Sequence, residues 1–95
     1  MNDALTSFLT AYFHQDWKSE FSNSLDAVNE FISTSPEELR IQLLCEVELL
    51  LYKKDLKEDL VWLLGGNFRP ESEGFTIKLW LQEIERALQE SMGFK

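Results

Sequence analysis

The residues of this chain that could do chemistry gather at positions 12–17, which read Tyr-Phe-His-Gln-Asp-Trp. His14 is the single histidine of the 95 residues, and Asp16 supplies a carboxylate two positions later. An imidazole beside a carboxylate can activate a serine, so nucleophilic catalysis is the first chemistry to consider. No Gly-x-Ser-x-Gly or other nucleophile signature occurs in the sequence. We therefore expect no enzymatic activity and name no catalytic residue, and a small hydrolase that uses His14 stays as an alternative.

Metal and cofactor sites are not expected either. Cys45 is the only cysteine, which excludes an intramolecular disulfide and a zinc site built on paired thiolates. No His-Glu-x-x-His or EF-hand spacing is present, and the Gly-Gly-Asn-Phe segment at 65–68 lacks the lysine of a phosphate-binding loop. Cys45 lies in the apolar run at 42–51, so we expect a buried and unreactive thiol. A single thiol without a basic N-terminal signal favours a reducing, cytoplasmic location.

The net charge of −8 restricts the class of partner. Phosphate contacts dominate affinity for nucleic acids, so an acidic chain is not expected to bind DNA or RNA directly. The same charge disfavours an anionic membrane surface, and no window approaches about 18 consecutive apolar residues. Attraction between opposite charges speeds encounter, so the charge suits a basic protein partner.

The acidic residues are spread unevenly along the chain. Residues 1–48 contain nine acids and two bases, whereas residues 49–95 contain eight acids and seven bases. The interval between Ser19 and Leu39 contains no base at all. This asymmetry is compatible with plain solubility, but it also points to one face that meets a positive surface.

The elements that must position these residues are helices, because apolar residues recur with a helical period and no segment alternates with period two. A first helix starts at Asn2 or Asp3, which can cap it, and ends near His14. Its apolar stripe consists of Leu5, Phe8, Leu9, Tyr12 and Phe13. A second helix starts near Ser24, with one apolar side formed by Leu25, Val28 and Ile32 and with Phe31 beside them.

Three further helices are expected in the remainder of the chain. The third has a capping box in which Ser35 is the N-cap and Glu38 its partner, with Pro36 at the first helical position. Only one row of its body is polar: Glu38, Gln42 and Glu46. The fourth helix runs from Leu56 to Leu64 and ends at Gly65 or Gly66. The last begins at Thr76 and buries Ile77, Trp80, Leu81, Ile84 and Leu88.

The expected fold is therefore all-α, a compact single domain over residues 1–95 with about five helices. In this fold His14 and Asp16 have two interpretations. They can end the first helix, with Asp16 bonded to nearby amides and Trp17 folded onto the core. Alternatively, Asp16 presents its charge to a partner, with His14 or Trp17 as an anchor. Trp62 and Leu79 also have two interpretations, because each either covers a neighbouring helix or belongs to an exposed patch.

Four segments of the chain resemble the immunity proteins of bacterial contact-dependent growth inhibition systems. They are Tyr12–Trp17, Asp26–Ile32, Ser35–Leu39 and Trp80–Leu81. The resemblance implies a small cytoplasmic protein that binds and neutralises a cognate toxin domain, and many such toxins are nucleases with basic surfaces. The residues of the shared motif are expected to be structural: Tyr12, Phe13, His14, Trp17 and Trp80.

The candidate toxin-binding residues come from the acidic half of the chain instead. They are Asp16, Glu20, Asp26, Glu30, Glu37 and Glu38. We expect them to pair with lysines and arginines of the toxin, so that a monomer in a 1:1 complex keeps nucleic acid from the active site without any cofactor. The alternative is an adaptor bundle that binds another protein through a hydrophobic groove, supported by Trp62, Leu79 and the apolar third helix.

Overall fold

The computed structural model describes residues 3–93, and within this range every regular element is helical. The elements are α1 (Asp3–Tyr12), α2 (Trp17–Glu20), α3 (Ser24–Thr34), α4 (Glu37–Leu51), α5 (Leu60–Leu63), the 3-10 helix η1 (Pro70–Glu73) and α6 (Ile77–Ser91). Asn2, one of the two expected caps of the first helix, lies outside the described residues. Among residues 3–93 no helix is long and apolar enough to cross a membrane. The expectation of an all-α fold is confirmed.

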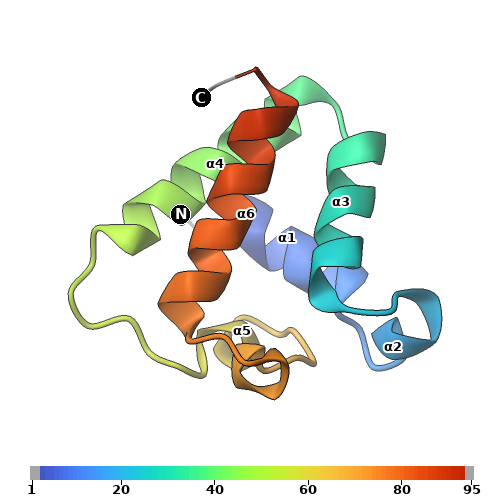
Figure 1. Cartoon of the computed structure of the whole chain (residues 1–95), viewed down its shortest axis with the longest axis vertical. Helices are drawn as coiled ribbons and strands as arrows, with labels where there is room; N and C mark the ends of the chain where they lie inside the picture. Colours follow the sequence, from blue (N-terminus) through green and yellow to red (C-terminus); the bar gives the residue numbers. More distant parts are fainter. Residues whose placement is uncertain (1–2, 94–95) are drawn as a thin grey trace.

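The four longer helices form the body of the bundle, and the short ones gather at one end (Figure 1). The long helices α4 and α6 pack against each other, α1 packs on α4, and α3 packs on α6. The short helices α2 and α5 and the loop with η1 close the lower end of the molecule as drawn (Figure 1). One core is shared by all four long helices.

The strongest prediction from periodicity concerns α6, and it is confirmed. Thr76 caps the helix by accepting a hydrogen bond from the amide of Leu79. Gly65, which lies just after α5, takes the positive φ expected at the end of the fourth predicted helix. The whole expected stripe is at most 2% exposed: Ile77, Trp80, Leu81, Ile84 and Leu88. An amphipathic helix of this kind derives most of its stability from the apolar face that it buries.

Four aromatic side chains join the two ends of the chain at the centre of the core. Phe13 lies 5.0 Å from Trp17, 5.2 Å from Phe68 and 5.7 Å from Trp80, measured between ring centroids. The indole N–H of Trp17 donates to the carbonyl of Asn67 at 2.9 Å. Trp17 therefore folds onto the core, as the structural interpretation of this corner predicted.

The buried face of α3 is rotated from the one that we expected. Its buried residues are Ser24, Ala27, Val28 and Phe31, whereas Leu25 and Ile32 are only partly buried. The rotation follows from two contacts at opposite ends of the helix. Phe31 packs on Phe8 of α1, with ring centroids 4.9 Å apart, and Ser24 meets side chains of α6 and η1.

The expected capping box at the start of α4 is wrong. The helix begins at Glu37, Pro36 occupies the N-cap position, and no side chain caps it. Ser35 instead ends α3, because its amide donates to the carbonyl of Phe31 at 2.9 Å. Only Pro36 separates Ser35 from α4, so Ser35 stands one position before the N-cap of that helix.

The polar side of α4 also differs from the expected row. Glu46 is only 6% exposed, and Cys45, which we expected to be buried, is exposed. Glu46 is buried because its carboxylate accepts the amides of Ala4 and Leu5 at 3.0 and 2.8 Å. The carboxylate thus compensates the free amides and the positive end of the α1 dipole.

The expected helix from Leu56 to Leu64 is reduced to the four residues of α5, and an unexpected short helix, α2, follows the first corner. Before α5, the two carboxylate oxygens of Glu58 lie 3.3 Å from the amide of Ile77 at the start of α6. The segment before α5 therefore makes a tertiary contact with α6. A helix of one turn, such as α5, is marginal without packing.

Replacing Glu46 by Gln tests how much the buried carboxylate stabilises the fold. We expect the free energy of unfolding in urea to fall by about 1–3 kcal/mol, because charge-assisted bonds to the two α1 amides are lost. The matched control is Glu38→Gln, an exposed acid two turns earlier on the same helix, which should change stability by less than about 0.5 kcal/mol. Equal effects of the two substitutions would contradict a special role of Glu46.

Candidate functional site

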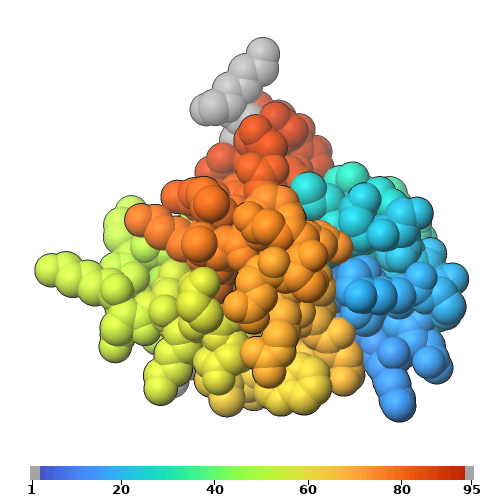
Figure 2. All heavy atoms as spheres, turned by 60° about the horizontal axis from the view of Figure 1, so that its bottom comes forward, coloured from blue at the N-terminus to red at the C-terminus, as the bar shows by residue number. Residues whose placement is uncertain are grey.

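All six acids that we named as toxin-binding candidates are exposed. We call them the acidic edge: Asp16, Glu20, Asp26, Glu30, Glu37 and Glu38. They lie on or beside α2, on α3 and on the first turn of α4. The surfaces of α2, in blue, and α3, in cyan, adjoin each other (Figure 2).

The acidic edge is long rather than compact. Helix α2 lies near the first residues of α3, and α4 starts beyond its last residue (Figure 1). An 11-residue helix such as α3 is about 16 Å long, so Glu20 and Glu37 stand at opposite ends of it. Asp26 and Glu30, four residues apart, share one side of α3 between them. The structure therefore spreads the candidates over three consecutive elements and does not bring them into one pocket.

The corner that holds Asp16 and Glu20 is built around His14. Nδ1 of His14 accepts a hydrogen bond from the amide of Asp16 at 3.1 Å, and Nε2 lies 3.3 Å from Oε2 of Glu20. An accepting Nδ1 carries no hydrogen, so the neutral ring places its hydrogen on Nε2 and donates it to Glu20. His14 thereby orients Glu20. The expectation that the side chain of Asp16 bonds to nearby amides is wrong, because it makes no capping bond to α2.

The same geometry bears on the hydrolase alternative. The hydroxyl of Ser19, the nearest serine along the chain, donates to the carbonyl of Asp16 at 2.7 Å rather than to His14. The imidazole meets Glu20 instead of the carboxylate of Asp16. Within residues 3–93, no group of three or more His, Cys, Asp or Glu side chains is placed to hold a metal ion.

Helix α3 is fixed in place by a buried hydrogen-bond network at its start. The amide of Ser24 donates to Glu73 at 2.9 Å, and its hydroxyl donates to the other oxygen of the same carboxylate. That hydroxyl also accepts the indole N–H of Trp80 at 3.0 Å. Asn23 caps the helix through the amide of Asp26. Ser24, Glu73 and Trp80 therefore hold α3 against α6, and this sets the direction in which Asp26 and Glu30 project.

Basic groups near the acidic edge are few. Among residues 3–93 the one basic side chain within 4 Å of a candidate acid is His14, which meets Glu20. Lys18 lies over the ring of Trp17, 5.9 Å from its centroid, and Arg86 pairs with Glu83 on its own helix. Most of the negative charge of the edge is therefore available to a partner.

Another pair of acids lies away from the edge, between α4 and α6. Burial, the charge of Glu48 and a hydrogen bond that the protonated Glu85 carboxyl donates to Glu48 raise the pKa of Glu85. Gln89 donates to Glu48 at 3.3 Å and supports the pair. Repulsion between these two carboxylates opposes folding at neutral pH, where both tend to be charged.

Two exposed apolar features correspond to the adaptor alternative. Trp62 is 52% exposed and Leu79 is 50% exposed, so both belong to the surface rather than covering a neighbouring helix. The guanidinium of Arg69 lies 5.4 Å from the centroid of the Trp62 ring. A separate hollow of about 340 Å³ lies between α1, the end of α3 and the start of α4. No sequence pattern indicates this hollow, because its walls come from three segments of the chain.

The sequence matches the family described as CdiI immunity protein over residues 2–88. No curated protein and no solved structure matches it. The matched range includes the whole acidic edge and the corner around His14.

The raised pKa of Glu85 predicts a specific dependence of stability on pH. Its native pKa lies above its unfolded value, so its contribution is fully present below the unfolded pKa and is lost as pH rises through the native pKa. Glu85→Gln should therefore raise the free energy of unfolding at pH 7 by about 0.5 kcal/mol, a small value because the group is partly exposed. The gain should vanish near pH 4. Chemical denaturation at both pH values checks this.

Glu90→Gln, which removes an exposed acid of the same helix, is the control for general loss of charge. A gain from Glu85→Gln that is equally large at pH 4, or no gain at pH 7, would rule out the proposed coupling with Glu48.

Proposed function

This chain belongs to the CdiI immunity protein family, and from that premise we propose that it binds and neutralises the cognate toxin domain of a contact-dependent growth inhibition system. The match over residues 2–88 is the observation that carries this role. The protein acts by binding in the cytoplasm, as a monomer in a 1:1 complex, with no turnover and no cofactor.

The toxin that we propose is a nuclease with a basic surface. The support is electrostatic: the chain has a net charge of −8, and the acidic edge is exposed. A nuclease needs positive charge to hold nucleic acid, and an acidic inhibitor attracts the same groups over a long range. Acids of the edge pair with lysines and arginines of the toxin, and the bound bundle keeps the nucleic acid away from the active site.

The shape of the acidic edge fits occlusion better than insertion into a narrow cleft. Its acids extend beyond both ends of the roughly 16 Å of α3, a span comparable with the face of a standard protein–protein interface. The core behind it is rigid, since Ser24, Trp80 and Glu73 fix the start of α3. Charges on rigid helices keep their spacing, so less side-chain and backbone freedom is lost on binding.

A second candidate function is an adaptor that binds a partner through apolar burial. Trp62 and Leu79, each about half exposed, are the observation in its favour. The two mechanisms differ in their response to salt, because screening weakens charge-led association and leaves apolar burial almost unchanged.

Charge reversal of the acidic edge tests the proposed mechanism. We expect Glu20→Lys, Asp26→Lys and Glu30→Lys, combined in one variant, to weaken binding of the cognate toxin domain at least about tenfold at low salt. The loss should lie mainly in the association rate and shrink near 0.5 M salt, where the Debye length is only about 4 Å. Association kinetics at two salt concentrations and growth rescue on co-expression measure both effects.

The matched control reverses three exposed acids outside the edge: Asp55→Lys, Asp59→Lys and Glu71→Lys. It changes the net charge by the same amount and should retain most of the affinity. If the control loses as much as the first variant, general charge and not the acidic edge drives binding. If neither affinity nor salt dependence changes in the first variant, the proposed face is wrong.

A further inference from the structure

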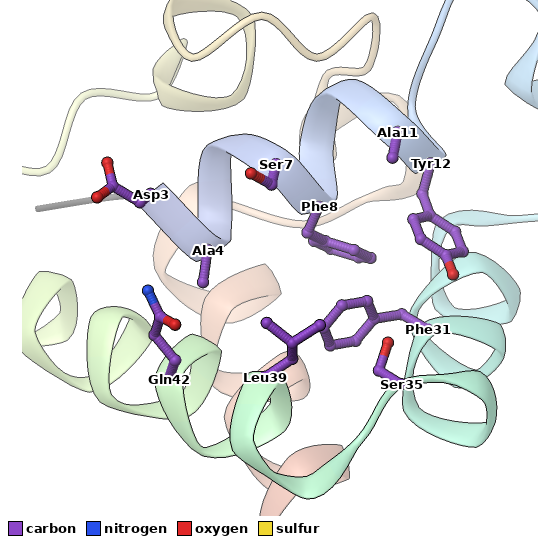
Figure 3. Close-up of a pocket in the computed structure, with 10 residues that line it drawn as sticks. All are labelled: Asp3, Ala4, Ser7, Phe8, Ala11, Tyr12, Phe31, Ser35, Leu39 and Gln42. Carbon is purple, nitrogen blue, oxygen red and sulfur yellow. The ribbon is translucent and has the colours of Figure 1, made fainter.

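An apolar groove on the surface opens between α1, the end of α3 and the start of α4 (Figure 3). Its floor is formed by Phe8 and Phe31, whose side chains point toward each other with ring centroids 4.9 Å apart. Leu39 approaches from α4 and Ala4 from α1 (Figure 3). With a volume of about 340 Å³, the groove is at the lower limit of ligand pockets and has room for one large side chain.

The groove stays open because small residues line the α1 side of it. Ala4, Ser7 and Ala11 occupy successive turns of that side, and their short side chains leave the floor formed by Phe8 and Phe31 uncovered. Leu39 is 44% exposed as a consequence. Covering such a surface with apolar atoms is favourable because it removes apolar area from water.

The charges around the groove specify what can cover it. None of the residues that line the groove is basic. Asp3 is the acid that lines the groove. Glu38 stands one turn before Gln42 on the row of α4 that faces α1, where Glu46 accepts the amides of Ala4 and Leu5. The base closest along the chain, Arg40, is directed toward α6, where its guanidinium lies 3.5 Å from the hydroxyl of Ser91. The opening is therefore acidic and its floor is apolar.

We propose that the groove receives a large apolar side chain of the toxin, with a neighbouring lysine or arginine of the toxin contacting Glu38. This inference rests on the proposed function and adds an anchor point to it. A second copy of this chain is disfavoured as the occupant, because each copy carries a charge of −8 and would meet its own repulsion. A buried apolar anchor next to an ion pair is the usual form of an interface hot spot. The acidic edge gives a fast encounter, and the groove gives a slow dissociation.

Filling the groove tests the proposal directly. Ser7→Phe and Ala11→Phe, made separately, each place a ring over the floor from a position that is exposed in the free protein. Each should weaken binding of the co-expressed toxin domain at least about tenfold, mainly through faster dissociation, near both 0.05 M and 0.5 M salt. Ser72→Phe makes the same change at an exposed site of η1, outside the groove and the acidic edge, and should bind like the unmodified chain. Thermal unfolding followed by circular dichroism verifies that each variant is folded.

The outcomes separate this inference from the proposed function. If the unmodified chain binds the toxin domain and both filled variants bind equally well, the groove is not an anchor although the immunity role stands. If Ser72→Phe weakens binding as much as the filled variants, or the defect of the filled variants disappears at high salt, the apolar anchor is also rejected. Failure of the unmodified chain to bind would reject both.

Discussion

The bundle depends on glutamate side chains that accept the open amides of distant helices. Glu46 of α4 accepts the amides of Ala4 and Leu5 in α1. Glu73 accepts that of Ser24 in α3, and Glu58 lies against that of Ile77 in α6. Helix starts leave up to four amides without partners, and a carboxylate satisfies them while matching the positive end of the dipole. Three helices are positioned in this way by acids from elsewhere in the chain. The acidic composition therefore has an internal role as well as an external one.

This division changes how the net charge of −8 relates to function. Glu46 is buried against α1, so its charge serves folding rather than recognition. The six acids of the edge are exposed, and a single histidine pairs with one of them. Charge that is rigidly held but not neutralised is well suited to attract a basic partner. The number of acids alone would not have distinguished the two groups.

Most of the fold could be predicted from the sequence because its long helices have local signals. The stripe of α6 and the cap at Thr76 are confirmed, and α1 ends at the corner before His14 as expected. The errors occur where tertiary contacts override local preference. Ser35 completes α3 instead of opening α4, and Glu58 reaches the start of α6 instead of extending a helix before α5. Glu46 was predicted to belong to a polar row because the two amides that it accepts, of Ala4 and Leu5, lie 42 and 41 residues away in the sequence.

The candidate site could be predicted only in part, for the same reason. Exposure of Asp26 and Glu30 follows from their positions on an amphipathic helix, which the sequence indicates. The orientation of Glu20 by His14, and the groove between α1, α3 and α4, need segments that meet only in the folded chain.

The most direct test of the proposed binding surface is hydrogen exchange of the chain with and without its toxin domain. The proposed binding surface predicts that amides of α2, α3 and the first turns of α1 and α4 exchange more slowly in the complex. Exchange in α5 and η1 should be unchanged. Protection confined to α5, η1 and the surface around Trp62 would contradict the proposed binding surface.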